Sequence, residues 1–218
     1  MASRCALVAG ATGLVGGHVV DRLVESADVG RVVVLVRKKS DKWSGKVEQK
    51  IVDYDALDPK DFEGVDDVYL CLGTTIKKAG SQDAFRKVDH EYTLAVARAA
   101  KGAGASRCAL VSSIGASPKS STFYSRVKGE TDRDVEALDF GDLVIARPSF
   151  LVGDRQESRP GERAAIAVAS VLQWTLVGGL AKYRSIEAKQ VARAMVAALP
   201  DAGQRLILEH DAIVELAR

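Results

Sequence analysis

The sequence predicts an α/β fold of the doubly wound kind, in which helices cover both faces of one parallel sheet. Short apolar runs alternate with longer segments of helical periodicity from one end of the chain to the other. The chain has 218 residues, of which 47% are hydrophobic and 28% charged, so it can bury a full core and stay soluble. No linker rich in proline or serine divides it. We therefore predict a single domain over residues 1–218.

Six apolar runs are predicted to form buried strands. They are short and rich in β-branched residues, and glycine or charged residues bound them. They cover residues 5–9, 31–36, 46–52, 68–72, 107–111 and 143–146. Helices are predicted between them, over residues 15–24, 81–101 and 121–138. Strands that alternate with helices in this way are typical of a parallel sheet with helices on both faces.

The alternation is less regular in residues 147–218. This region begins with a loop over residues 150–161, followed by an alanine-rich helix over 164–181. A second helix is predicted near residues 187–199 and a last strand over 205–208. Ligands of doubly wound folds bind outside the carboxyl edge of the sheet. We therefore expect residues 147–218 to form a small substrate-side region within the domain.

Composition argues against two classes of partner. The net charge is only +2, and no long basic run is present, so nucleic acid is not expected as the main partner. The segment 164–181 carries no charge, but its glycine pair and polar residues favour a buried helix over a membrane span. We expect neither a nucleic acid nor a membrane partner.

The cysteines and histidines give no sign of a metal site. Cys5, Cys71 and Cys108 have no CxxC spacing, and their odd number argues against a disulfide framework. His18 and His210 have no partners at ligand spacing, so no metal is expected. The first predicted strand begins near residue 4 and leaves no room for a signal peptide. Together with reduced thiols, this predicts a cytoplasmic protein.

A glycine-rich loop connects the first strand to the first helix. The loop reads Gly10-Ala11-Thr12-Gly13-Leu14-Val15-Gly16. GxxGxxG between a strand and a helix is typical of the phosphate loop of a Rossmann fold. Glycine lets the backbone approach a pyrophosphate, and the helix N-terminus offers free N–H groups to it. We predict that a nicotinamide dinucleotide contacts Gly10, Thr12, Gly13, Leu14, Val15 and Gly16.

The residues after the second and third strands bear on the choice of dinucleotide. NAD-selective sites usually end the second strand with an acidic residue, which binds the ribose 2′-hydroxyl. Here Arg37-Lys38-Lys39 follows, and Arg37 and Lys38 would hold the 2′-phosphate of NADP(H). A solvated basic turn is the alternative. Asp53 either accepts a hydrogen bond from the adenine amino group or stabilises a turn. We expect NADP(H) rather than NAD(H).

A serine, a tyrosine and a lysine are spaced as a catalytic set. Ser113 ends the fifth strand, and the next helix carries Tyr124 and Lys128 four residues apart, on one face. An ammonium beside a tyrosine favours the phenolate, which makes the hydroxyl a better acid and base at neutral pH. Ser113 would hold a substrate oxygen while Tyr124 exchanges a proton with it and hydride moves to or from the nicotinamide. The alternative is a packed helix face.

These motifs resemble those of the atypical short-chain dehydrogenases/reductases, and within them the family of the Tat-interacting protein of thirty kilodaltons and its bacterial relatives. The likeness covers residues 4–200. Besides the phosphate loop it includes CLGTT at 71–75, YSRVKGE at 124–130, Arg147-Pro148 and DRQESRPGE at 154–162. The resemblance implies catalytic roles for Ser113, Tyr124 and Lys128. It implies cofactor contacts for Arg37, Leu72, Gly73, Thr74 and Pro148.

One position departs from this pattern, and one loop within the pattern has two possible roles. Many short-chain relatives carry an asparagine before the fifth strand that supports a proton relay, whereas this sequence has Val88-Asp89-His90. His90 could serve as a relay, but a lone, partly exposed histidine is more often a surface residue. In the loop 154–162, Arg155 and Arg159 either clamp an anionic substrate or pair with acidic residues of the same loop.

Three functions are open at this point. The leading hypothesis is an NADP(H)-dependent oxidoreductase acting on a small carbonyl or alcohol. The second is a non-catalytic, NADP(H)-sensing regulatory protein, although such proteins often lack the tyrosine. The third is a nucleotide-sugar epimerase or dehydratase, for which the region after residue 147 is short. The apolar helices at 81–101 and 121–138 could form a homodimer contact.

Overall fold

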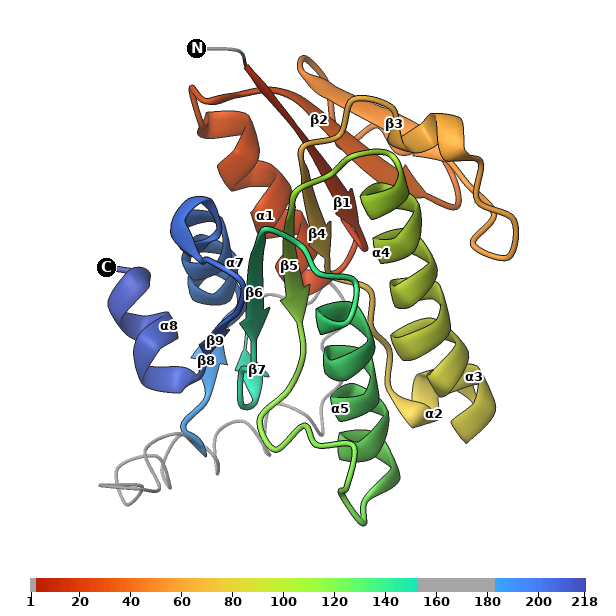
Figure 1. Ribbon diagram of the computed structural model, residues 1–218, viewed down its shortest axis with the longest axis vertical. Coiled ribbons are helices and arrows are strands. Elements are labelled where there is room, and N and C mark those ends of the chain that lie inside the picture. The colour runs from red at the N-terminus through yellow and green to blue at the C-terminus, as the bar shows by residue number, and fades with distance from the viewer. Residues whose placement is uncertain (1–2, 153–182) are drawn as a thin grey trace.

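The computed structural model describes residues 3–152 and 183–218. Its centre is a sheet of seven parallel strands (Figure 1). These are β1 (Arg4–Ala9), β2 (Val29–Val36), β3 (Val47–Ile51), β4 (Asp67–Leu70), β5 (Arg107–Val111), β6 (Asp142–Ala146) and β9 (Leu206–Leu208). Their order in the sheet is β3-β2-β1-β4-β5-β6-β9. The predicted doubly wound parallel sheet is confirmed.

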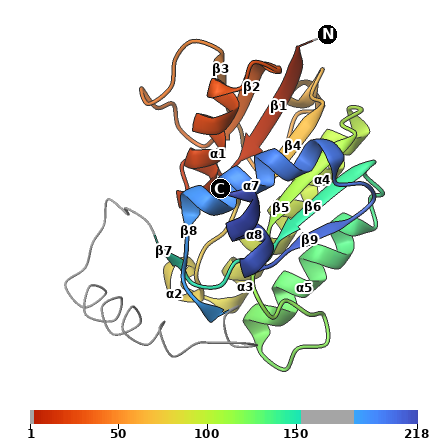
Figure 2. The ribbon, with the colours of Figure 1, turned by 90° about the vertical axis from the view of Figure 1, so that its left-hand side faces the viewer.

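Helices cover both faces of this sheet, as Figure 2 shows. On one face lie α1 (Leu14–Glu25), α7 (Ala188–Ala198) and α8 (His210–Leu216); on the other lie α4 (Thr93–Gly102) and α5 (Phe123–Glu136). The short helices α2 (Ile76–Ala79) and α3 (Gln82–Arg86) precede α4. A separate pair of parallel strands, β7 (Leu151–Val152) and β8 (Ile186–Glu187), follows β6 in the chain.

The side chains of each strand alternate between two hydrophobic cores, as a parallel sheet covered on both faces requires. In β1, Ala6 and Val8 belong to the core beneath α1 and α7. Cys5, Leu7 and Ala9 belong to the core beneath α4 and α5. All five are buried. The side chains of β1 thus contribute alternately to the two cores, and helices pack on both faces of the same sheet.

The strand order reverses at β1, and this places the site. From β1 the chain passes outward to β2 and β3, and then returns to β4 on the other side of β1. At such a switch point the loops after the two central strands diverge, so a crevice opens at the carboxyl edge of the sheet. The loops after β1 and β4 contain residues 10–13 and 71–75, which the sequence assigned to a dinucleotide.

The helix predicted over residues 81–101 is not a regular α-helix. Between α3 and α4 the chain forms a π-helical turn, Lys87–Tyr92. Thr93 Oγ1 donates to the carbonyl of Val88, five residues earlier, at 3.3 Å. A π turn inserts an extra residue and changes the directions of the side chains relative to an α-helix. Asp89 and His90 lie in this turn, and both are buried.

Further differences lie at element ends and in the last third. The predicted strand 68–72 ends at Leu70, and α2, α8 and the β7–β8 pair were not predicted. The predicted helix 164–181 and most of the loop 150–161 lie outside the described residues, so the substrate-side role of residues 147–218 stays a prediction. Among the residues that are described, no helix is long and apolar enough to cross a membrane, and no side-chain cluster could hold a metal ion.

Candidate active site

Close backbone contacts build the loop after β1. Gly10 has a φ of +84°, in the left-handed region that favours glycine. A Cβ on Gly10 would lie 2.3 Å from the carbonyl oxygen of Cys71, and one on Gly16 would lie 2.2 Å from the carbonyl oxygen of Gly10. The Gly13 N–H donates to that Gly10 oxygen at 2.9 Å. The glycines therefore allow close backbone contact of the loop with α1 and with Cys71, the residue after β4.

The first turn of α1 is open to a ligand's negative charge. Its N-cap residue is Gly13, none of the described residues caps the turn with a side chain, and the turn holds no acidic residue. Thr12 is exposed and Leu14 is half-buried, whereas Val15 is buried in the core. Leu14 and Val15 would therefore contact a phosphate through their backbone N–H groups, which is the usual way a helix N-terminus binds an anion.

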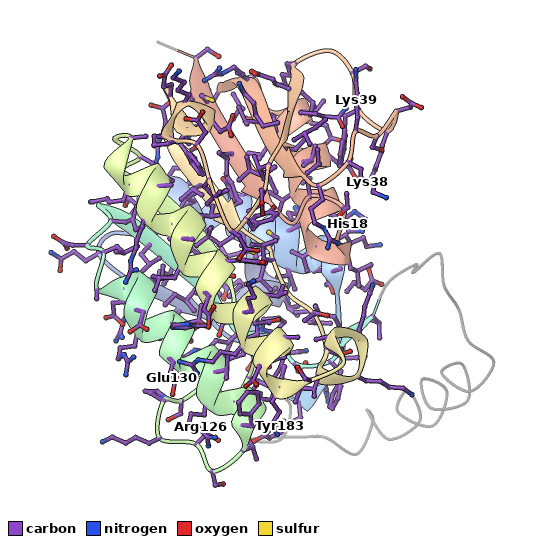
Figure 3. The ribbon with its side chains drawn as sticks, turned by 90° about the vertical axis from the view of Figure 1, so that its right-hand side faces the viewer. His18, Lys38, Lys39, Arg126, Glu130 and Tyr183 are labelled. Carbon is purple, nitrogen blue, oxygen red and sulfur yellow. The ribbon has the colours of Figure 1, made fainter. Side chains whose placement is uncertain are left out.

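Exposed cations gather beside the beginning of α1. Arg37 and Lys38 follow β2, and both are exposed. Figure 3 shows Lys38 on the same flank of the molecule as His18 of α1. The sequence reasoning missed Lys42, whose Nζ lies 3.2 Å from the position that a Cβ of Gly17 would take. Together these cations create a positive potential suited to an additional phosphate.

Asp53 and Tyr54 follow β3, the neighbour of β2. Asp53 is exposed, and its Oδ1 accepts the N–H of Asp55 at 2.9 Å, so it stabilises a turn. An adenine contact of Asp53 stays a prediction. The Tyr54 hydroxyl donates to the carbonyl of Leu35 at 3.3 Å. Burial raises the pKa of Tyr54 to about 12 against the opposing influence of Arg37, so the hydroxyl stays protonated at neutral pH.

The loop after β4 lies beside the phosphate loop, where the Cys71 carbonyl approaches Gly10. Leu72 and Thr74 are half-buried, and Gly73 is exposed. The Thr74 N–H donates to Oδ2 of Asp89 at 2.9 Å. The three residues predicted to contact the cofactor thus lie together at the carboxyl edge, and a buried carboxylate of the π turn fixes the loop.

The loop that carries Ser113 is fixed from two sides. The Ile114 N–H donates to the carbonyl of the buried Pro148 at 2.9 Å. Helix α5 packs on the loop at Gly129, where a Cβ would lie 2.1 Å from the carbonyl carbon of Ser117. Gly129 was not predicted as a site residue, although a glycine inside a helix can signal a close backbone approach. Among the described residues, Ser113 Oγ makes only a long bond of 3.4 Å, to the Ile114 carbonyl, which a substrate oxygen could replace.

Tyr124 and Lys128 lie one turn apart on α5 but differ in exposure. Tyr124 is 38% exposed, and its ring packs on Phe85 with centroids 5.4 Å apart. Lys128 is 6% exposed. Its Nζ lies 2.8 Å from Oδ1 of Asp89 and donates to the carbonyl of Val111, at the end of β5, at 3.5 Å. An accessible tyrosine therefore lies one helical turn from a buried ammonium, and that ammonium reaches the strand end that precedes Ser112-Ser113.

Neighbouring groups keep the Lys128 ammonium charged. Burial by itself would lower the pKa of Lys128, but attraction to Asp89, and to a smaller extent to Tyr124 and Asp132, outweighs it. The pKa of Lys128 therefore lies above its ordinary value, and the side chain is positive at neutral pH. Asp89 was not among the predicted site residues. A signal in the sequence was its departure from the asparagine of many short-chain relatives.

The expectation that His90 is partly exposed is wrong. The side chain is buried, and its Nε2 lies 2.8 Å from Oδ2 of Asp134 on α5. The reason is the π turn, which directs Asp89 toward Lys128 and directs the next residue, His90, to a different carboxylate. His90 thus joins the π turn to α5 at Asp134, whereas Asp89 joins it at Lys128.

A second buried carboxylate lies on α5. Asp132 Oδ2 accepts a hydrogen bond from Arg147 Nε at 3.0 Å and lies 2.9 Å from Arg147 Nη2. Burial raises the pKa of Asp132, and the Ser112 hydroxyl and the Arg147 guanidinium oppose this shift. Because Arg147 directly precedes Pro148, the ion pair anchors the segment after β6 to the helix that carries Tyr124. The predicted substrate residues Arg155 and Arg159 lie outside the described residues.

The sequence matches a family described as NAD(P)H-binding, over residues 10–202. Protein HTATIP2 of Rattus norvegicus is 36% identical over 225 residues, which cover 100% of this chain and 91% of that protein. Protein FMP52, mitochondrial, of Eremothecium gossypii is 38% identical over 164 residues, with 75% and 73% covered. The fmp52 protein of Aspergillus clavatus is 36% identical over 195 residues, with 86% and 83% covered.

The names of the fungal relatives contradict the expectation of a cytoplasmic protein. Those of Eremothecium gossypii, Aspergillus clavatus and Scheffersomyces stipitis are all named mitochondrial. The expectation depended on reduced cysteines and on the lack of a secretory signal. Neither observation distinguishes the cytoplasm from another compartment that keeps thiols reduced.

Solved structures share the fold. The UDP-glucose 4-epimerase of Thermotoga maritima with UDP-glucose has a TM-score of 0.70 at 17% identity, covering 98% of this chain and 81% of that one. A short-chain dehydrogenase/reductase superfamily protein of Agrobacterium tumefaciens with bound NAD has a TM-score of 0.70 at 18% identity, covering 95% and 78%. These identities show the fold alone. The family match and the relative aligned over the whole chain show more: the chain belongs to the NAD(P)H-binding family that includes HTATIP2 and FMP52.

Proposed function

We propose that this chain is an NADP(H)-dependent oxidoreductase that transfers hydride between the nicotinamide and a small carbonyl or alcohol. The observation that carries the proposal is the pair on α5, in which Tyr124 is accessible and Lys128, one helical turn away, is buried and positively charged. The pair stands at the carboxyl edge of the sheet, on the same edge as the phosphate loop. Membership of an NAD(P)H-binding family supports a dinucleotide at that edge.

Each side chain has a separate task in the proposed reaction. A bound NADPH would supply the hydride. Tyr124 gives a proton to the carbonyl oxygen during reduction and takes one from the alcohol during oxidation. The ammonium of Lys128 stabilises the phenolate that remains on Tyr124 after proton donation. Ser113 orients the substrate oxygen by a hydrogen bond that replaces its long contact to Ile114.

The residues present fit a dinucleotide with a 2′-phosphate. Any side chain at Gly10 or Gly16 would collide with backbone, so the loop packs closely on its neighbours. The N-terminus of α1 beside it has no side-chain cap, and its N–H groups are free to bind a phosphate. Arg37 and Lys38 are exposed at the end of β2, and Lys42 reaches the first turns of α1. A second phosphate group bound at the end of β2 would lie among these cations.

The alternative functions differ from the proposal in what they require of Tyr124. An NADP(H)-sensing protein would bind the cofactor through the same loop and reduce no carbonyl compound. The solved structures with UDP-sugars share only the fold with this chain, at 16–17% identity, and no described residue argues for a nucleotide sugar. The pairing of Tyr124 with Lys128 therefore favours the oxidoreductase.

Reversing the charge of Arg37 is expected to abolish the preference for NADPH. Because a guanidinium binds a phosphate by two charge-assisted hydrogen bonds, Arg37→Glu should weaken NADPH binding by about tenfold or more. NADH affinity should stay the same or improve. Quenching of protein fluorescence by NADPH and by NADH measures both constants. Lys60→Glu, at an exposed lysine between β3 and β4, is the matched control and should change neither.

The wild-type titration decides between the remaining possibilities. Equal affinity for NADPH and NADH would remove Arg37 and Lys38 from the cofactor site. If neither dinucleotide binds, the oxidoreductase proposal fails and a partner-binding role replaces it. Strong binding of NADPH without turnover of any aldehyde or ketone would instead support the sensing protein.

A further inference from the structure

Asp89 connects three elements of the site. Its Oδ1 lies 2.8 Å from Lys128 Nζ on α5, and its Oδ2 accepts the N–H of Thr74, in the loop after β4, at 2.9 Å. Its carbonyl accepts the hydroxyl of Thr131 on α5 at 3.2 Å. The side chain is 1% exposed. One buried carboxylate therefore holds both the proposed catalytic lysine and the loop predicted to contact the cofactor.

The π turn makes this geometry possible. It runs Lys87–Tyr92 and connects α3 to α4. Two successive residues of the turn reach α5 at different points, Asp89 at Lys128 and His90 at Asp134. Neighbouring residues of a regular α-helix point about 100° apart, and a π turn changes that spacing. π turns of this kind are frequent at functional sites.

Asp89 is the direct counter-ion of Lys128. Among the described residues, the charged and titratable groups with the largest influence on Lys128 are Asp89 from the π turn, and Tyr124 and Asp132 from its own helix. Strand β5 contributes only the carbonyl of Val111. Asp132 is itself paired with Arg147, so most of its charge is already balanced. Removing the charge of Asp89 would leave the ammonium buried without a close partner.

We propose that Asp89 is a positioning residue that holds the Lys128 ammonium and the loop at Thr74 in place, and that its negative charge stabilises that ammonium. This inference rests on the proposed function, because it assigns Asp89 a task through the pair that exchanges the proton. Asp89 itself touches neither substrate nor reacting atoms.

The sign of the effect follows from the charges. A carboxylate 2.8 Å from the ammonium stabilises its charged form. Without that carboxylate, burial destabilises the ammonium, and the uncompensated ammonium favours the phenolate. Both changes release a proton more easily. Because the two groups are coupled, the quantity to measure is the pH at which the pair loses its first proton.

Asp89→Asn tests this without a substrate. The variant keeps the size of the side chain and removes the charge. Protein labelled with ¹³C at Tyr Cζ and Lys Cε is titrated in an NMR experiment, and spectra of Tyr124→Phe and Lys128→Met identify the two signals. In Asp89→Asn the earlier of the two midpoints should move down by about one pH unit or more relative to wild type. An unchanged or higher midpoint overturns the proposal.

Asp134→Asn is the matched control for charge. It removes a carboxylate from the same pair of elements, but ten residues beyond Tyr124 on α5, about 15 Å along the helix. In Asp134→Asn the earlier of the two titration midpoints should stay within about 0.3 pH unit of its wild-type value. A shift as large as that of Asp89→Asn would mean that net charge, and not the contact to Lys128, sets the titration, and would overturn the proposal.

The hydrogen bond between Asp89 and the Thr74 amide is tested by a separate measurement. Asp89→Ala removes both acceptor oxygens, whereas Asp89→Asn keeps one that Thr74 can use. Hydrogen exchange of the Thr74 amide should therefore be fastest in Asp89→Ala and closer to wild type in Asp89→Asn. Equal exchange in all three proteins would overturn the positioning of the loop by Asp89.

If Asp89→Asn does not fold, the double variant Asp89→Asn with Lys128→Met replaces it. Lys128→Met alone leaves a buried carboxylate unpaired, so the double variant should melt at a higher temperature than Lys128→Met. A double variant that melts lower than Lys128→Met would overturn the direct pairing. These measurements need no cofactor, so they can succeed where NADPH binding fails. In that case the role of Asp89 at the pair stands and the oxidoreductase proposal falls.

Discussion

Tyr124→Phe is expected to lower kcat for carbonyl reduction by about 10²- to 10⁴-fold, the usual contribution of a positioned acid or base. The phenylalanine ring keeps the contact to Phe85 and removes only the hydroxyl that would give up the proton. NADPH affinity should stay within about twofold, because Tyr124 lies on α5 and the phosphate loop lies between β1 and α1. Loss of NADPH absorbance with a panel of small aldehydes and ketones measures the rate.

Tyr92→Phe is the matched control for this experiment. Its hydroxyl donates to Asp55 at 2.9 Å, outside the proposed site. The variant should keep wild-type kcat and lose about 0.5–1.5 kcal/mol of stability at most. If Tyr124→Phe turns over as fast as wild type, Tyr124 is not the proton donor and the proposed mechanism is wrong.

The fold could be predicted because its signals are local. Strands such as β1 and β5 are short β-branched or apolar runs with charged residues or glycine at their ends, and burial on both faces makes such runs continuous. The short elements α2 and α8 escaped prediction because four or seven residues give too little periodicity. The pairing of β7 with β8 joins residues more than thirty apart in the chain, and no local pattern encodes that contact.

The site was predictable only where spacing along one helix or one loop defines it. Tyr124 and Lys128 share α5, so their four-residue spacing places them together. Asp89 reaches Lys128 from another helix, and only because a π turn changes the direction of its side chain. A regular helix over 81–101 would have given it a different direction. The position of Lys42 beside α1 was not predicted for a similar reason, because its approach to Gly17 depends on the conformation of the loop after β2.

Gly16→Ala and Gly17→Ala are expected to have opposite effects although they are adjacent in α1. A Cβ at position 16 would lie 2.2 Å from the carbonyl oxygen of Gly10 and 2.8 Å from its carbonyl carbon. These are backbone atoms of the phosphate loop, so the loop must move away from the helix. We expect Gly16→Ala to lose about 1–3 kcal/mol of unfolding free energy and to weaken NADPH binding by about a hundredfold.

At position 17 the added Cβ would instead meet the end of a flexible side chain, Lys42 Nζ, at 3.2 Å, with the Ala11 carbonyl oxygen at 3.5 Å. The ammonium can swing away, and alanine is favoured over glycine inside a helix. Gly17→Ala should therefore keep its NADPH affinity within about threefold and gain up to about 1 kcal/mol of stability. Urea unfolding and fluorescence titration of both variants measure the two quantities.

The contrast isolates one physical cause. Both substitutions add one methyl group to the same helix turn, so differences in helix propensity cancel between them. What remains is whether the methyl group meets backbone of the loop or a mobile ammonium. Wild-type NADPH binding by Gly16→Ala would show that the loop has room to move while it holds the phosphates, and the close approach of Gly10 to α1 would then serve stability alone.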